Sequence, residues 1–123
     1  DGIDTVKIDD IDKVIYIRRY DYLSTESIAR PTDFVLHDNF PNPFNPTTQI
    51  RFDLPITGNV RFTIYNMLGQ KVKEYQMNGL SAGYHTLTWN ATNDLGDPMS
   101  AGIYFYQIQT KEFTRTKRMV LLK

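Results

Sequence analysis

The chain has 123 residues, no cysteine and a net charge of zero, with 14 basic and 14 acidic side chains. This length favours one domain with a short appendage, and the lack of net charge gives no general affinity for nucleic acid. Without cysteine the fold must be stabilised by packing, and no apolar run approaches the ~18 residues that a membrane-spanning helix needs. The 13% of aromatic residues, with many Thr, Val and Ile, favour β-structure.

The first strong strand signal is an uninterrupted β-prone run formed by Val14, Ile15, Tyr16 and Ile17, which is followed by a polar linker at 18–33. Such a run on an open sheet edge promotes aggregation, so it must pair with something. It could be the last strand of an upstream domain, or it could add to the sheet of this domain. It could also be donated to the sheet edge of a neighbouring copy, which would suit the acidic start and basic end of the chain.

Residues 38–46, DNFPNPFNP, predict a stiff extended segment that we call the strap. Its prolines at positions 41, 43 and 46 fix φ and remove backbone donors, which excludes a helix and a central strand. The residue before each proline is pushed toward extended geometry as well. We expect Phe40 and Phe44 to pin the strap to the surface of a β-domain.

Short strands are predicted from the strap to the last residue, by alternation of apolar and polar side chains or by β-branched and aromatic enrichment. A break in alternation between Val72 and Tyr75 predicts a β-bulge, and the last two strands should form a hairpin around 111–112. Glycine and proline lie almost wholly between the strands. The predicted strands cover 49–54, 59–65, 72–77, 84–90, 103–109 and 113–122.

Short strands with regular turn signals, and no sustained helical periodicity, predict an all-β fold. The fold class we expect is an immunoglobulin-like antiparallel β-sandwich with an N-terminal extended strand segment. The expected domains are a strand and linker segment at 1–33 and the sandwich at 34–123. The first segment would be the tail of an upstream domain or a donated strand.

The sequence gives no support for catalysis, and we predict no enzyme, no catalytic residue and no cofactor. The serines lie in linker or turn segments and none occupies a Gly-x-Ser-x-Gly elbow. His37 precedes the strap, and His85 shares a strand face with Leu87 and Trp89, which favours a packed histidine over a general base.

One loop gathers oxygen-bearing side chains. Asp94 and Asp97, together with Asn90 and Asn93, offer the ligands that Ca²⁺ prefers, although their spacing matches no EF-hand. Asx side chains also bind their own backbone in turns. Turn chemistry is therefore the favoured interpretation, and Asp94 and Asp97 are a weak calcium candidate.

Consecutive aromatics at 104–106 suggest a platform for a carbohydrate. Neighbouring residues of a strand point to opposite faces, so at least one of the three belongs to the core. A carbohydrate-binding accessory module is thus a weaker alternative. Nucleic-acid binding is not expected, because the basic end of the chain lacks a net positive field around it.

Ordered motifs extend over the last 90 residues. They are NFPNPFNPTT at 39–48, IRFDLP at 50–55, VRFTIYNMLGQKV at 60–72, LSAGYH at 80–85, WN at 89–90, AGIYFY at 101–106 and KRMVLLK at 117–123. In these motifs the chain from Phe34 to Lys123 resembles the C-terminal sorting domain of proteins exported by the type IX (Por) secretion system.

This resemblance implies an immunoglobulin-like sandwich, similar to the one in the flagellar hook-capping protein. It implies a non-enzymatic module that sends a secreted protein across the outer membrane to the bacterial cell surface. The implied partners are the translocon, which reads the folded domain, and a sortase-like enzyme that in many members removes it. The implied recognition residues are Pro41, Asn42, Pro43 and Phe44 of the strap, Gly102 and Tyr104, and Lys117, Arg118 and Lys123 of the last strand.

A different class of function remains open beside this one. Donation of residues 1–30 to the next copy, without ring closure, would make the chain a self-assembling extracellular filament subunit.

Overall fold

A computed structural model describes residues 30–122 of the protein. The chain divides into two units, Asp1–Arg30 and Pro31–Lys123, and the described residues belong almost wholly to the second. The run from Val14 to Ile17 and the terminal Lys123 lie outside them, so the pairing of that run, the filament and the boundary at 33/34 all stay predictions. No helix long and apolar enough to cross a membrane occurs in the described part.

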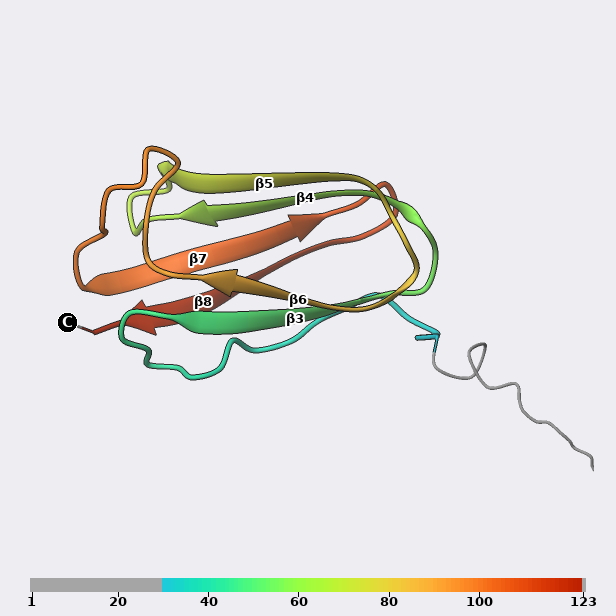
Figure 1. Cartoon of the computed structure of the whole chain (residues 1–123), viewed down its shortest axis with the longest axis horizontal. Helices are drawn as coiled ribbons and strands as arrows, with labels where there is room; N and C mark the ends of the chain where they lie inside the picture. The colour runs from blue at the N-terminus through green and yellow to red at the C-terminus, as the bar shows by residue number, and fades with distance from the viewer. Residues whose placement is uncertain (1–29, 123) are drawn as a thin grey trace, which may run out of the picture. The chain divides into compact units, whose positions relative to one another are not determined.

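Two antiparallel sheets form the second unit (Figure 1). The first has the order β2-β3-β6 and the second the order β5-β4-β7-β8. The all-β fold predicted from the sequence is therefore confirmed, in the form of a β-sandwich. The strands are β2 Val35–Leu36, β3 Thr48–Leu54, β4 Gly58–Tyr65, β5 Lys71–Leu80, β6 Gly83–Trp89, β7 Gly102–Gln109 and β8 Thr114–Leu121.

The six predicted strands after the strap are all present, and five of them agree with the structure to within one residue at each end. β5 is longer than predicted, because Asn78 and Gly79 continue the strand although they are typical turn residues. The pairing of β5 with β4 shifts register there, opposite Gly58 and Val60. The predicted bulge lies at Val72, where Lys71 and Lys73 pair with consecutive residues of β4. The sequence did not predict β2, whose two residues are too few to show alternation.

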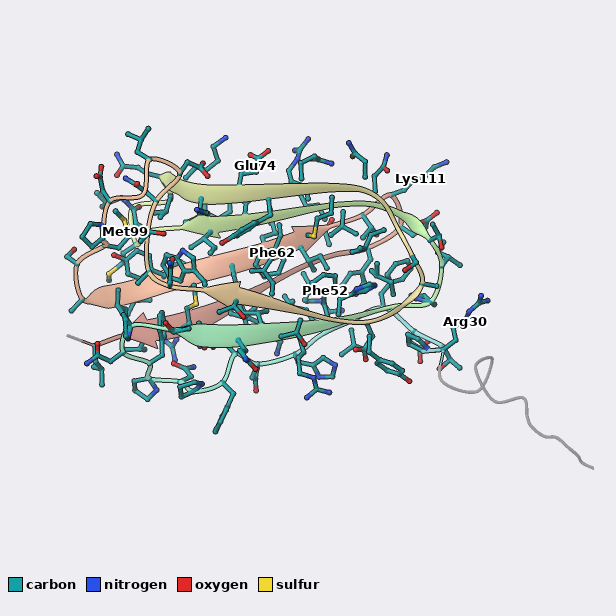
Figure 2. All side chains as sticks on the ribbon, viewed as in Figure 1. Arg30, Phe52, Phe62, Glu74, Met99 and Lys111 are labelled. Carbon is teal, nitrogen blue, oxygen red and sulfur yellow. The ribbon has the colours of Figure 1, made fainter. Side chains whose placement is uncertain are left out.

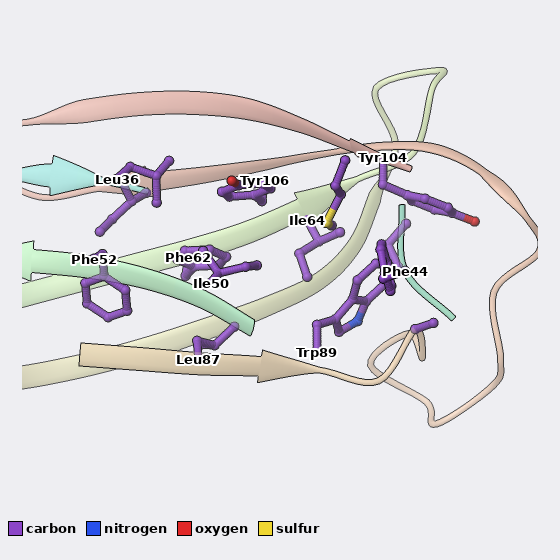
Figure 3. Close-up of a cluster of buried hydrophobic side chains, with 14 of the residues drawn as sticks. Leu36, Phe44, Ile50, Phe52, Phe62, Ile64, Leu87, Trp89, Tyr104 and Tyr106 are labelled. Atoms are coloured by element: carbon purple, nitrogen blue, oxygen red, sulfur yellow. The ribbon is translucent and has the colours of Figure 1, made fainter. Parts of the chain in front are cut away.

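Alternation in the strands builds the core between the two sheets. Phe52 of β3 and Phe62 of β4 face each other across the layers with ring centroids 6.1 Å apart (Figure 2). Phe62 also stacks on Tyr106 of β7 at 5.9 Å. At one end of the core Phe44, Trp89 and Tyr104 lie together (Figure 3). This packing uses residues from both sheets, so neither sheet buries its apolar face alone.

Tyr106 is fully buried, and its hydroxyl donates a hydrogen bond to the carbonyl oxygen of His37 at 2.8 Å. Burial raises the pKa of Tyr106 to about 12, and the charge of Asp38 adds to the rise. In the unfolded chain the Tyr106 hydroxyl loses its proton near pH 10, whereas in the folded chain it keeps that proton at this pH. The contribution of Tyr106 to the free energy of unfolding is therefore constant below pH 10. It falls as the pH rises toward 12.

We expect Tyr106→Phe to lack this alkaline loss of stability. In urea titrations the wild type should be the more stable by about 1 kcal/mol at neutral pH, since the variant loses one hydrogen bond. The difference should shrink between about pH 10 and about pH 12 because only the wild type has this proton to lose. A difference that stays constant through pH 12 would show that the Tyr106 pKa is not raised.

Candidate recognition surface

The strap and β8, which are far apart in sequence, are hydrogen-bonded to each other. The amide of Phe44 donates to the carbonyl of Val120 at 3.0 Å, and the amide of Leu122 donates to the carbonyl of Phe44 at 2.8 Å. Asn42 adds a side-chain bond, because its Oδ1 accepts from the amide of Val120 at 3.0 Å. The strap and the last residues of β8 therefore form one continuous surface.

The other end of the strap is held by the opposite sheet. Phe40 and Gln49 of β3 exchange two backbone hydrogen bonds of 2.9 Å. The Asn39 amide donates to Thr48 Oγ1 at 3.0 Å, and the Thr48 hydroxyl donates to the carbonyl of Pro41 at 2.9 Å. Asn39 and Thr48 are both buried, so this polar contact fixes where the strap leaves β3.

The two aromatic residues of the strap have different environments. Phe44 is 1% exposed and packs on Trp89 with ring centroids 5.8 Å apart. Phe40 is 79% exposed, so the expectation that both rings pin the strap is wrong for this residue. Its backbone pairs with Gln49 of β3, whose side chain is exposed. Side chains of residues directly opposite each other lie on the same face, so the Phe40 ring also points out of the sandwich. Only Phe44 anchors the strap by burial.

Three of the four predicted recognition residues in the strap are exposed. Pro41, Asn42 and Pro43 all face solvent, and the peptide bonds before Pro41, Pro43 and Pro46 are cis. They follow one another on the same surface as the end of β8. The exposed strap residues therefore lie beside Val120 and Leu122.

Gly102 and Tyr104 support this surface from β7. Gly102 pairs with Leu121, is exposed, and has a φ of +156°, a value that residues with a side chain rarely adopt, with open space where a Cβ would lie. Tyr104 is buried, meets Trp89 edge-on at 5.4 Å and donates its hydroxyl hydrogen to the carbonyl of Ser100 at 2.6 Å. Gly102 is therefore accessible from outside, whereas Tyr104 belongs to the core beneath.

The basic residues of β8 point to opposite sides of the strand, as neighbours must. Lys117 Nζ lies 2.9 Å from Asp38 Oδ1, so its charge joins β8 to the start of the strap. Arg118 is exposed on the outer face and pairs through its backbone with Phe105. The sequence did not predict Asp38 as a partner of a basic residue, although it is the one carboxylate of the strap.

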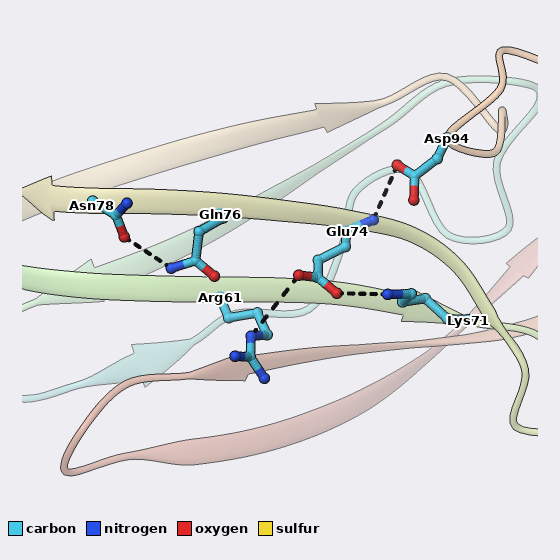
Figure 4. Close-up of polar contacts among 6 residues, drawn as sticks. All are labelled: Arg61, Lys71, Glu74, Gln76, Asn78 and Asp94. Carbon is cyan, nitrogen blue, oxygen red and sulfur yellow. Dashed lines mark hydrogen bonds and ion pairs between the residues drawn. The ribbon is translucent and has the colours of Figure 1, made fainter.

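In the oxygen-rich loop the side chain of Asn93 makes the contacts of a turn. Asn93 Oδ1 accepts from the amides of Leu95 and Asp97 at 3.0 and 2.9 Å. Asp94 Oδ1 accepts from the amide of Glu74 at 3.3 Å, which places the loop on the edge of β5 (Figure 4). No group of three or more His, Cys, Asp or Glu within residues 30–122 could hold a metal ion. The calcium candidate at Asp94 and Asp97 stays an untested prediction.

Both histidines have structural partners. His37 Nε2 lies 3.0 Å from Asp53 Oδ2, which ties the residues before the strap to β3. His85 stacks on Phe52 at 5.4 Å, and its Nε2 lies 2.7 Å from the carbonyl oxygen of Ser81. Neither ring is hydrogen-bonded to a hydroxyl side chain in the part of the chain described. The stacking of His85 on Phe52 is the packed role expected for this histidine.

The aromatic run at 104–106 does not form a platform. Tyr104 and Tyr106 are buried on the inner face of β7, and only Phe105, which is half-buried, lies on the outer face. A sugar-binding site that uses all three rings is therefore absent from this strand.

The two strap phenylalanines provide a matched pair of variants. Phe44→Ala should lower the free energy of unfolding by ~3–5 kcal/mol, because it leaves a cavity against Trp89. Phe40→Ala should change it by less than ~0.5 kcal/mol, because the ring is in solvent. Chemical denaturation of the two variants measures both values. Similar losses in both variants would contradict the assignment of Phe44 as the anchor.

Comparison with known protein families gives one match. The family model described as secretion system C-terminal sorting domain matches residues 38–122, which is most of the chain and includes the strap and β8. No curated protein sequence matches the chain significantly.

Two solved structures are similar in fold. Dimeric latent PorU from Porphyromonas gingivalis is 21% identical with a TM-score of 0.58, over 73% of this chain and 9% of that one. FlgD from Xanthomonas campestris, described for hook capping in flagellar assembly, is 19% identical with a TM-score of 0.51, over 71% of this chain and 64% of that one. The chain thus spans less than two thirds of either protein. On the family match, it belongs to the secretion-system C-terminal sorting domains, which are sorting signals of the type IX secretion system.

Proposed function

We propose that this domain directs the protein that carries it across the outer membrane to the cell surface, through recognition by the type IX machinery and without catalysis of its own. The family match supports a sorting signal. The destination at the cell surface and the face of the domain that is read go beyond that match. Its partners would be the translocon and the sortase-like component that acts on exported proteins.

The observation that carries the proposal is the hydrogen-bonded junction of the strap and β8. Two backbone bonds and one side-chain bond hold residues 42–44 against 120–122. The two segments are far from each other in the sequence, so this surface exists only when the sandwich is folded. A receptor that binds here would therefore accept folded domains and reject unfolded chains.

We assign different roles to the recognition residues according to their exposure. Pro41, Asn42, Pro43, Gly102 and Arg118 are exposed and available for direct contact. Phe44 and Tyr104 are buried and hold that surface in shape. Lys117 keeps part of its charge accessible while it pairs with Asp38, and Lys123 is retained as a contact from the resemblance alone.

Arg118→Glu should block export without unfolding the domain. A secreted reporter fused in front of the whole chain, in a bacterium with a type IX system, should reach the cell surface. The Arg118→Glu version should lose about tenfold or more of the surface signal, as expected if recognition is weakened by at least about 1.4 kcal/mol. The side chain is exposed, so thermal unfolding of the purified variant should match the wild type.

Lys111→Glu makes the same change of charge in the exposed turn between β7 and β8 and serves as the control. It should export normally, because it lies at the other end of the hairpin from Gly102 and Leu121. Equal export of all three versions would refute the assignment of Arg118. Failure of the wild-type fusion to leave the periplasm would refute the proposed function itself.

A further inference from the structure

The sheet order leaves four strands at sheet edges in the described unit, namely β2, β5, β6 and β8. An open edge exposes unpaired backbone groups that can accept a strand from another chain, and proteins usually protect such edges with charges, prolines, bulges or covering loops. Three of these edges are protected by such features, and β6 is not.

β5 is protected in two ways. Its pairing with β4 is interrupted by two register shifts, which twist the strand. The loop after β6 also covers its edge, because the amide of Asp94 donates to the carbonyl of Val72 at 3.1 Å and the Asp94 carboxylate accepts from Glu74 (Figure 4). Lys71 and Glu74 form an ion pair of 3.0 Å beside that contact.

The edges on the opposite side are protected by the strap and by charge. The strap continues β2 along β3 and carries three prolines. It then covers the end of β8 at Leu121. The rest of β8 carries Arg115, Lys117 and Arg118, whose like charges oppose pairing with a second copy of the same strand.

β6 has none of these features. Its sequence, GYHTLTW, contains no proline and no Lys, Arg, Asp or Glu, and it pairs with β3 without a register shift. The residues Tyr, Thr and Trp are strong strand formers. Tyr84, Thr86 and Thr88 are all exposed.

Hydrogen bonds on the far side of β3 show which groups of β6 point outward. Arg51 accepts from His37, and Gln49 exchanges bonds with Phe40, so the backbone groups of Arg51 and Gln49 point away from β6. Their partners on β6 are Thr86 and Thr88. In an antiparallel pair such partners are not hydrogen-bonded to each other, and their own N–H and C=O groups point to the outer edge.

By the same alternation Tyr84, which is opposite Asp53, also points its backbone groups outward. Three alternate residues of β6, Tyr84, Thr86 and Thr88, therefore offer amide donors and carbonyl acceptors at this edge. None of these groups has a hydrogen-bond partner within residues 30–122. The edge of β6 therefore has the free backbone donors and acceptors that pairing with one more strand requires.

We propose that β6 pairs antiparallel with β6 of a second copy of this chain, about a two-fold axis through Thr86. Thr86 then lies opposite Thr86 of the other copy, and Tyr84 lies opposite Thr88. Each of these pairs exchanges two backbone hydrogen bonds. The two three-stranded sheets become one continuous sheet across the interface.

A second copy fits this edge for reasons of charge and side-chain pairing. No charged side chain projects from the strand, so two copies approach without repulsion, unlike two copies of β8. On the solvent face the register creates Thr–Thr and Tyr–Thr cross-strand pairs, which belong to the favourable classes. The recognition surface is separate from β6, so the dimer does not depend on the proposed export function.

Sedimentation equilibrium of the full chain over a range of concentrations should show a reversible monomer–dimer equilibrium. Thr86→Lys should raise the dimer dissociation constant by about tenfold or more, because the two-fold axis places the two new charges face to face. Thr86→Asp should do the same. An equimolar mixture of the two variants should recover the affinity, since opposite charges then meet across the axis.

Thr114→Lys is the matched control, because it adds the same charge to an exposed threonine on β8. It should leave the dissociation constant unchanged. Thr86→Lys places a like charge opposite Arg51 of β3 and should lower the unfolding temperature, whereas Thr86→Asp places an opposite charge there, so loss of the dimer in both variants separates the interface from an effect on folding. A chain that stays monomeric at every concentration overturns the proposal and leaves the β6 edge to a different strand. A dimer that Thr86→Lys does not weaken, or that the mixed variants do not restore, also overturns it.

Discussion

The crossing of the strap from one sheet to the other is the constraint on which the rest of the structure depends. Phe40 is paired with β3, and only four residues later Phe44 is paired with β8. Sheets in a sandwich lie about 10 Å apart, while four residues reach at most about 14 Å. The strap can therefore span the gap without a long detour, and burial of the Phe44 ring against Trp89 fixes the point where it arrives. Prolines suit this path because they reduce the freedom that the chain loses on folding.

This crossing determines how the end of β8 is presented. Met119 and Leu121 are buried in the core, and Val120 and Leu122 are held from outside by the strap. Arg118, which directly precedes these residues, is therefore displayed on a rigid strand. A receptor that reads such a strand loses little conformational entropy on binding, because the fold has already ordered its target. In a sorting signal this links recognition to completed folding through ordinary packing and hydrogen bonding.

The sequence predicted what depends on local pattern and missed what depends on long-range contact. Alternation in β3, β4 and β6 identified the inward faces, because burial of one face imposes a period of two. Phe40 was misassigned, since a single aromatic in an extended segment has no local signal for its side. The Asp38–Lys117 pair and the covering of β5 by Asp94 were missed for the same reason. Each joins segments at least 20 residues apart, where spacing carries no information about proximity.

The protection of the edges follows from the same geometry. The strap lies beside β8, and Tyr106 of β7 donates a hydrogen bond to His37, which directly precedes the strap. One open side of the sandwich is therefore closed by the chain that enters the domain. On the other side a loop covers β5 but leaves β6 uncovered within the described residues. The surface proposed for recognition uses the strap and β8, whereas strand pairing would use β6, which is in the other sheet. One domain could therefore bind the export machinery and a second copy of itself at the same time, because the two events use different strands and compete for no residue.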